Sequence, residues 1–275
     1  MSQMRNMVTF QKMNGAGNDF VVFDNRDGSL QFTAAQIAKI CDRHRGVGAD
    51  GILLVEPAEG DADFKMRYYN SDGGEAEMCG NGARCFARFA HRVSGCSSGL
   101  SFETLAGVIH ARISGEQVSL TMSAPHDLRL NLDLRVGDGM AQVHSLNTGV
   151  PHAVEFVEHL ERVNVHDRGA QIRWHDAFEP RGTNANFIKK LSDHVIAIRT
   201  YERGVEGETL ACGTGVVASA LIHAVVHGVS SPISVEVRGG ETMDVGFERD
   251  GEHFRNVTLT GPADFVFSGE IEIDG

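Results

Sequence analysis

The strongest constraint on the fold is a segment that occurs twice. "EAEMCGNGARCFARFAH" at 75–91 reappears in weaker form as "ETLACGTGVVASALIHA" at 208–224. The copies lie 133 residues apart, from Cys79 to Cys212, and the same offset matches other pairs: Asn14 and Asn147, Val21 and Val154, Phe23 and Phe156, Tyr68 and Tyr201. Collinear matches at one offset indicate an internal duplication. The offset grows to 139 between "VSLT" (118–121) and "VTLT" (257–260), which predicts a longer hairpin in the second half.

Each half combines strand and helix patterns. Alternating runs predict strands at 8–13, 20–25, 51–56 and 64–70, and turn signals occur at Asn14-Gly15, Asp27-Gly28 and Asp72-Gly73. Thr33 is a good N-cap for a helix that carries Ile37, Ile40 and Cys41 on one face, and Gly46 is a stop signal.

The segments after Cys79 and Cys212 have apolar residues at helical spacing. The second is apolar on nearly all sides, which predicts a buried helix with a sheet around it. The fold class is therefore α/β (α+β), with two units that each combine a sheet and a central helix. A chain of 275 residues is long enough for two domains.

Composition narrows the possible partners. A net charge of −12 argues against nucleic acid and against an anionic membrane surface. The start "MSQMRNMVTF" lacks the apolar stretch of a signal peptide, and we expect a cytoplasmic protein. The cysteine count of five is odd and no CxxC pair occurs, so we expect reduced thiols. We interpret Cys41, Cys85 and Cys96 as small buried apolar residues.

Cys79 and Cys212 each directly precede a Gly-x-Gly that opens a predicted helix. A helix N-terminus lowers the pKa of a thiol and offers N–H groups to a carboxylate. If the two halves pack face to face, two thiols flank whatever binds between them. Such a pair suits inversion at a stereocentre, because one thiolate removes a proton and the other thiol delivers one from behind. The two thiols should titrate together and, when oxidised without substrate, form an inhibitory disulfide.

Five motifs resemble the diaminopimelate epimerase family: "MNGAGNDFVVFD", "RHRGVGADG", "YYNSDGGEAEMCGNGARCFARF", "RGTNANF" and "YERGVEGETLACGTG". The resemblance covers essentially the whole chain. It implies two pseudo-symmetric lobes, each a curved, mostly antiparallel sheet around a central helix, with the active site in the cleft between them. The N-terminal lobe is then 1–123 and the C-terminal lobe 124–264, and a strand at 265–275 returns to the first lobe.

The resemblance also implies the chemistry. The family interconverts LL- and meso-2,6-diaminopimelate, a precursor of lysine and peptidoglycan, without pyridoxal phosphate, metal or other cofactor. Cys79 and Cys212 match its catalytic thiols. His152 and Glu202 match a supporting pair near the reacting amino group, and Arg203 suits the distal carboxylate because a guanidinium binds it bidentately. The remaining positions that match substrate contacts are Asn18, Asn70, Gly80, Asn81, Asn184, Gly213 and Thr214.

The chain departs from the family pattern at two positions. Gly51 stands where some members carry Gln, and Val150 where many carry Asn. The side-chain contacts at both positions are therefore open, and a water or a neighbouring amide is a candidate replacement.

Other functions stay open at this point. A proline racemase or hydroxyproline epimerase would use the same two-thiol logic, but it resembles Cys-Gly-His-Gly at the first site, where Asn81 stands here. A thiol redox protein would cycle Cys79 and Cys212 through a disulfide, and a non-catalytic binding module is a third option. No dinucleotide, P-loop or zinc motif is present in the sequence. A homodimer paired through edge strands of one lobe is compatible with the pattern, and the oligomeric state stays open.

Overall fold

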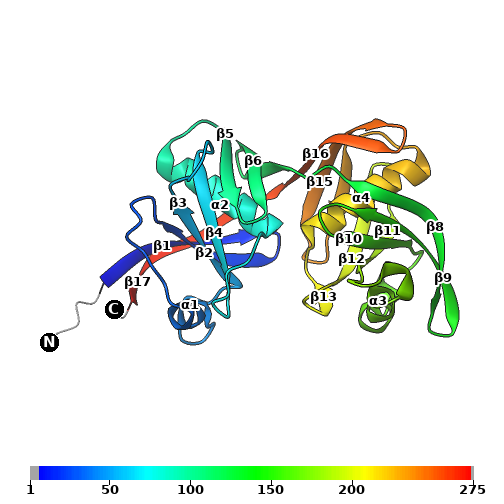
Figure 1. Cartoon of the computed structure of the whole chain (residues 1–275), viewed down its shortest axis with the longest axis horizontal. Coiled ribbons are helices and arrows are strands. Elements are labelled where there is room, and N and C mark those ends of the chain that lie inside the picture. Colours follow the sequence, from blue (N-terminus) through cyan, green and yellow to red (C-terminus); the bar gives the residue numbers. More distant parts are fainter. Residues whose placement is uncertain (1–5, 274–275) are drawn as a thin grey trace. The chain divides into compact units, whose positions relative to one another are not determined.

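A computed structural model describes residues 6–273, so the ends of the first lobe and of the returning strand, at 1–5 and 274–275, lie outside the described residues. The chain has a mixed α/β fold made mostly of strands (Figure 1). It divides into two compact units. Unit 1 comprises residues 6–120 and 261–273, and unit 2 is Thr121–Thr260.

Unit 1 is a sheet with two helices. Its elements are β1 (Asn6–Gly15), β2 (Asn18–Asp24), α1 (Ala34–Cys41), β3 (Gly51–Glu56), β4 (Phe64–Asn70), α2 (Gly80–Ser94), β5 (Gly99–Thr104), β6 (Gly107–Ser114), β7 (Gln117–Thr121) and β17 (Asp264–Ile273). The strand order is β17-β1-β2-β3-β4-β5-β6-β7, with β2–β3 and β4–β5 parallel and the other pairs antiparallel. Helix α2 packs against β1, β2, β3, β4 and β6 (Figure 1).

Unit 2 repeats this plan. Its elements are β8 (His126–Val136), β9 (Gly139–Asn147), β10 (Pro151–Phe156), η1 (Leu160–Arg162), α3 (Val165–Arg173), η2 (Asp176–Phe178), β11 (Asn184–Lys190), β12 (Val195–Glu202), β13 (Gly207–Thr209), α4 (Gly213–His227), β14 (Ile233–Glu236), β15 (Thr242–Asp250) and β16 (His253–Pro262). The order is β8-β9-β10-β11-β12-β14-β15-β16, with β10–β11 and β12–β14 parallel, and β13 also pairs with β12. Strand order and direction are thus the same in both units, which supports the internal duplication.

The two cysteine-capped helices have the same length and the same kinds of residue at both ends. Helices α2 and α4 each have 15 residues, with Cys79 and Cys212 as their N-caps. Each ends at a glycine in the left-handed region, Gly95 or Gly228, where only a residue without a side chain fits easily. Helix α4 is buried over most of its length and packs against β9, β10, β11, β12, β14 and β15. The predicted buried helix is confirmed.

Most of the predicted local structure is confirmed. The four predicted strands correspond to β1, β2, β3 and β4, and Thr33 caps α1 in a capping box with Gln36. The hairpin β15–β16 has longer arms than β6–β7, as the change in offset predicts. No helix within residues 6–273 is long and apolar enough to span a membrane.

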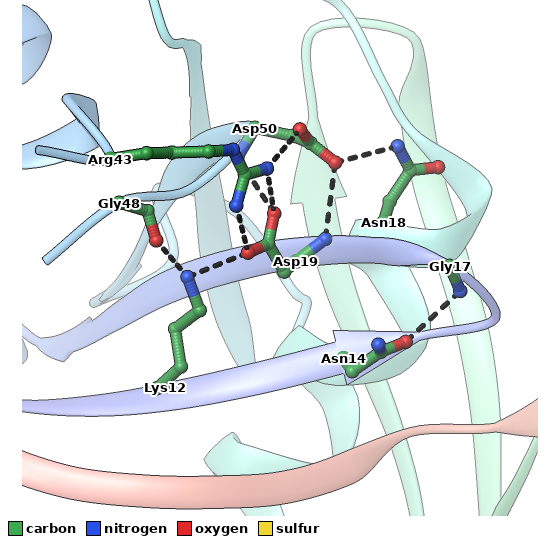
Figure 2. Close-up of polar contacts among 8 residues, drawn as sticks. All are labelled: Lys12, Asn14, Gly17, Asn18, Asp19, Arg43, Gly48 and Asp50. Carbon is green, nitrogen blue, oxygen red and sulfur yellow. Dashed lines mark hydrogen bonds and ion pairs between the residues drawn. The ribbon is translucent and has the colours of Figure 1, made fainter.

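Three local predictions are wrong. The first turn lies at Ala16-Gly17 rather than Asn14-Gly15, because residues 14 and 15 still pair with β2 and Gly17 N–H donates to Asn14 Oδ1 at 3.0 Å (Figure 2). Helix α1 ends at Cys41, before Gly46, since the Asp42 side chain accepts the next backbone N–H groups and competes with further helix. Cys96 is half-buried rather than buried.

Candidate active site

Cys79 occupies the N-cap of α2 in extended backbone conformation. Its Sγ accepts a hydrogen bond from the N–H of Gly82 at 3.5 Å and is half-buried. The N–H groups of the first helical turn have no partner inside a helix and lie at the positive end of its dipole. Gly80 and Asn81 belong to that turn, so the predicted carboxylate-binding positions adjoin the thiol in sequence and in the helix.

Asn18 and Asn81 are joined by their amides. Nδ2 of Asn81 donates to Oδ1 of Asn18 at 2.7 Å, and Oδ1 of Asn81 accepts from the guanidinium of Arg84, also at 2.7 Å. Arg84 is fully buried and donates further to the Gly15 and Pro262 carbonyls. The structure therefore brings two predicted substrate contacts together beside the start of α2.

A charged network holds the other side of Asn18 (Figure 2). Asp50 Oδ2 accepts from Asn18 Nδ2 at 2.9 Å, and Asp50 Oδ1 accepts from Arg43 at 2.9 Å. Arg43 also binds both carboxylate oxygens of Asp19, which Lys12 contacts at 2.7 Å. Although burial opposes it, hydrogen bonding to Arg43 and Lys12 lowers the pKa of Asp19 to about 2. The ionised Asp19 carboxylate holds Arg43 in place, and Arg43 in turn binds Asp50, which accepts from the Asn18 amide.

Asn70 is the last residue of β4 and lies opposite Gly51, the first residue of β3. Its Oδ1 accepts from the hydroxyl of Tyr68 at 2.7 Å, and its backbone pairs with Gly51. A side chain at Gly51 would collide with the Tyr69 carbonyl and would stand 2.7 Å from Cε2 of Tyr68. The backbone and the Tyr68 ring therefore fill the space where a longer residue at 51 would begin.

In unit 2, Cys212 caps α4 with 8% of its surface exposed. Its Sγ lies 3.6 Å from Thr214 Oγ1, and the thiol also hydrogen-bonds to Glu202. Burial raises the pKa of Glu202, while hydrogen bonds from Thr209 and Cys212 act in the opposite direction. The Thr209 hydroxyl lies 2.9 Å from Glu202 Oε2. The Cys212 thiol, the Thr209 hydroxyl and the half-buried Glu202 carboxyl are thus in mutual contact through Glu202.

Asn184 connects two further predicted residues. Its Nδ2 donates to the Pro151 carbonyl at 3.1 Å, and its Oδ1 accepts from the N–H of Arg203 at 2.8 Å. The parallel pairing of β10 and β11 sets His152 opposite Asn184. Burial, with the nearby charges of Arg173 and Arg181, lowers the pKa of Arg203.

His152 is fully buried beside the first turn of α4. Burial, with the positive charge of Arg203, lowers its pKa to about 3, so the ring is neutral near pH 7. Its Nδ1 lies 3.1 Å from Nδ2 of Asn186. At the other open position, the Val150 carbonyl accepts from the N–H of Thr148, whose hydroxyl donates to the Thr214 carbonyl at 2.9 Å.

The predicted residues therefore fall into two sets, and each set lies within one unit that contains one cysteine-capped helix. Unit 1 contains Asn18, Asn70, Cys79, Gly80 and Asn81, and unit 2 contains His152, Asn184, Glu202, Arg203, Cys212, Gly213 and Thr214. Within residues 6–273, no group of three His, Cys, Asp or Glu side chains is placed to hold a metal ion.

Sequence reasoning missed four residues whose side chains hydrogen-bond to predicted site residues and so fix their orientation. These are Asp50, Arg84, Asn186 and Thr209, which contact Asn18, Asn81, His152 and Glu202 respectively. All four lie inside motifs quoted for the resemblance: "RHRGVGADG", "YYNSDGGEAEMCGNGARCFARF", "RGTNANF" and "YERGVEGETLACGTG". Their polar character within those motifs was the available signal.

Comparison with known proteins places the chain in a family. The model of the family described as diaminopimelate epimerase matches residues 10–126 and 144–266. The diaminopimelate epimerase of Aquifex aeolicus is 43% identical over 96% of this chain and 98% of its own length. That of Chlorobaculum tepidum is 43% identical over 95% of this chain and 100% of its own length.

Solved structures share the fold at low identity. A hydroxyproline epimerase from Agrobacterium vitis superposes with a TM-score of 0.72 at 16% identity, over 99% of this chain and 94% of its own. A PhzF-family phenazine biosynthesis protein from Bacillus anthracis gives 0.71 at 19% identity, over 98% and 100%. These two likenesses concern the fold alone, whereas the family model and the relatives at 43% identity cover nearly the whole sequence. The chain belongs to the diaminopimelate epimerase family.

Proposed function

We propose that this protein interconverts LL- and meso-2,6-diaminopimelate by a two-base mechanism in which Cys79 and Cys212 act on opposite faces of one α-carbon. Its family membership makes it an isomerase of lysine biosynthesis. The observation that carries the mechanism is the repeated N-cap: each unit sets one cysteine at the start of a 15-residue helix, with polar side chains held around it. One thiolate removes the α-proton, and the other thiol protonates the opposite face.

The largest part of the activation barrier comes from the negative charge that develops on the substrate. The α-hydrogen of an amino acid is a far weaker acid than a thiol, so the negative charge that develops on the substrate carboxylate must be stabilised in the transition state. We assign this role to the first-turn N–H groups of α2 and α4, at Gly80 with Asn81 and at Gly213 with Thr214. Helix N-termini bind carboxylates through such groups.

We assign the remaining substrate contacts to the predicted side chains of units 1 and 2. We assign the distal carboxylate to Arg203, whose backbone is fixed by Asn184. Asn18 and Asn70 complete the binding of the carboxylates in unit 1. Glu202 and His152 adjoin the reacting amino group, and Glu202 also contacts the thiol of Cys212.

The proposal includes the arrangement of the lobes. We take units 1 and 2 to be pseudo-symmetric lobes, with domains at 1–123, 124–264 and a returning strand at 265–275, and with the site in the cleft between them. The pairing of β17 with β1 supports the returning strand. Function in the cytoplasm without a cofactor, and a homodimer, remain predictions.

The test uses the purified, reduced protein with LL-diaminopimelate and nothing else added. We expect conversion toward the meso form, and chiral chromatography measures the ratio of the two isomers over time. Cys79→Ala and Cys212→Ala should each abolish it. Cys85→Ala is the matched control, because Cys85 is fully buried and burial raises the pKa of its thiol to about 12. Full activity in either of the first two variants, or none in the reduced wild-type protein, would contradict the proposal.

A further inference from the structure

Arg173, the last residue of α3, binds two loops of unit 2 with one guanidinium. Its side chain is buried. Nη1 donates to the Arg181 carbonyl at 3.0 Å, in the loop 181–183 that leads into β11. Nε and Nη2 both contact Oε1 of Glu206, at 3.2 and 3.1 Å, in the loop 203–206 that follows β12. The guanidinium therefore joins two loops that are separate in sequence.

The two loops lead to substrate contacts of the proposed site. Asn184 directly follows the first loop, and Arg203 is the first residue of the second. The backbone N–H of Arg203 donates to Oδ1 of Asn184 at 2.8 Å, so the loops also meet at this point. One hydrogen bond leaves rotation about itself, whereas a second attachment through Arg173 restricts it.

The first loop packs directly on the end of α3. The N–H of Thr183 donates to the carbonyl of Arg173 at 3.2 Å. Gly182 has a φ of +66°, in the left-handed region, and a side chain there would collide with the guanidinium and the carbonyl of Arg173. A glycine at 182 thus allows the loop to approach Arg173 closely.

The second loop is organised by the carboxylate of Glu206. This carboxylate accepts from the N–H of Gly204 at 3.1 Å and from the hydroxyl of Tyr201 at 3.4 Å. Although burial opposes it, the hydrogen bond from Gly204 and the charge of Arg173 lower the pKa of Glu206. The backbone of Glu206 has a φ of +56°, which is uncommon for a residue with a side chain. Its contacts therefore hold the loop in a conformation that it would otherwise seldom adopt.

The charges near Arg203 favour an anion. Burial lowers the pKa of Arg203, the charges of Arg173 and Arg181 act in the same direction, and Glu206 opposes them. Three guanidinium groups thus lie near one carboxylate, in a chain whose net charge is −12. A second carboxylate beside Arg203 would reduce the repulsion among the three.

We propose that Arg173 is a positioning residue for substrate binding: it holds the Arg181 carbonyl and the Glu206 carboxylate at once, and so fixes the loops that place Asn184 and Arg203 for the distal carboxylate. Arg173 acts through these loops and not by contact with the substrate. The inference deepens the proposed function and rests on it for the role of Arg203.

The first test uses the ligand-free protein. Amide hydrogen exchange is followed by NMR at Arg203 and Gly204, whose N–H groups donate to the two loops' own acceptors. Arg173→Met removes the guanidinium, and we expect both amides to exchange about tenfold faster. Arg168→Met is the matched control, because Arg168 lies in the same helix and binds Glu155 bidentately. It should leave both rates unchanged. Unchanged rates in Arg173→Met, or equal acceleration in both variants, would overturn the proposal.

The second test is the split between KM and kcat. Arg173→Met should raise KM for diaminopimelate about tenfold and change kcat less than about twofold, because a loosened distal contact weakens ground-state and transition-state binding alike. Arg173→Lys keeps the charge but lacks the planar fork that reaches two acceptors, so its KM should lie in between. Arg168→Met should match wild type. A lower kcat with unchanged KM in Arg173→Met would indicate a loss of folded protein only and would refute the positioning role.

The exchange test needs no substrate, so its failure is separate from failure of the proposed function. Faster exchange in Arg173→Met, together with a wild-type protein that does not epimerise, would remove the epimerase proposal and keep the role of Arg173 in holding the loops. If Arg173→Met does not fold, Glu206→Gln tests the same attachment from its other end. It removes the charge and keeps the size, and the amide of Gly204 should still exchange several times faster. An unchanged rate in that variant would contradict the proposal.

Discussion

Nδ2 of Asn81 lies 2.7 Å from Oδ1 of Asn18, so the residue that follows Cys79 by two positions is hydrogen-bonded to the first residue of β2. The pair lies between opposite charges. Asp50 accepts from Asn18 at one end, and Arg84 donates to Asn81 at the other. Each amide therefore has one orientation only, and we predict that the second N–H of each donates to the substrate.

Replacing Asp50 should weaken substrate binding more than turnover. In Asp50→Asn an amide replaces the carboxylate and can present either end to Asn18, which loses its fixed orientation. We expect KM for diaminopimelate to rise about tenfold, equivalent to about 1.4 kcal/mol, with a smaller change in kcat. Steady-state kinetics measures the split.

Asp63→Asn is the control for that change. Asp63 accepts from the N–H and hydroxyl of Ser101 in the same unit, away from the predicted contacts. It should leave KM unchanged. The same rise in KM in both variants would mean that Asp50 affects only the stability of the unit and not the orientation of Asn18.

Removing one hydroxyl should loosen Asn70. Tyr68→Phe keeps the ring, which packs edge-on against Phe20, but removes the 2.7 Å hydrogen bond to Asn70. One hydrogen bond contributes about 1 kcal/mol, so kcat/KM should fall about fivefold. Tyr69→Phe, one position along the same strand, should have no such effect. Identical kinetics in the two variants would show that Tyr68 does not hold a substrate contact.

The pH profile should report on Glu202. Hydrogen bonds from Thr209 and Cys212 favour its carboxylate form, against the burial that raises its pKa. Thr209→Val removes one of these bonds, so the pKa of Glu202 rises further and the acid limb of kcat/KM moves to higher pH. Thr209→Ser retains a hydroxyl and should keep the wild-type limb. A shift to lower pH would contradict the assignment.

Asp19 should make stability depend on pH in the acid range. Its pKa is 3.8 in a free side chain and about 2 here, where Arg43 and Lys12 bind it. The contribution is complete above the unfolded value and is lost as pH falls through the folded one. Asp19→Asn should therefore lower the free energy of unfolding by about 2 kcal/mol at pH 7, with the difference shrinking below pH 4. Urea titrations of both proteins at pH 7 and below pH 4 measure the free energies of unfolding. The same difference between wild type and variant at both pH values would contradict the ion pairing of Asp19.

The local features of the site were predictable from sequence. The N-caps at Cys79 and Cys212 follow from Gly-x-Gly ahead of an apolar run, and the matched helices follow from the duplication. These signals are short-range, because a helix start depends on a few neighbouring residues. The offset between the halves also gave the longer hairpin of unit 2.

The residues that orient the site were not predictable, because their partners are distant in sequence. Asp50 meets Asn18 across 32 residues, and Asn186 meets His152 across 34. Arg84 stands inside the apolar face of α2, fully buried, and is stabilised by the carbonyls of Gly15 and Pro262. Nothing in helical periodicity indicates a buried guanidinium. Such contacts arise only when the strands are assembled around the helix.

The central claim is that two separate thiols serve the two faces of one carbon. The most direct measurement is the conversion of LL-diaminopimelate in deuterated water, stopped early, with the deuterium content of both isomers determined by mass spectrometry. Two bases predict deuterium at the α-carbon of the meso product and almost none in the recovered LL substrate. Deuterium entering recovered substrate and product at equal rates would indicate one base on one face and would contradict the account.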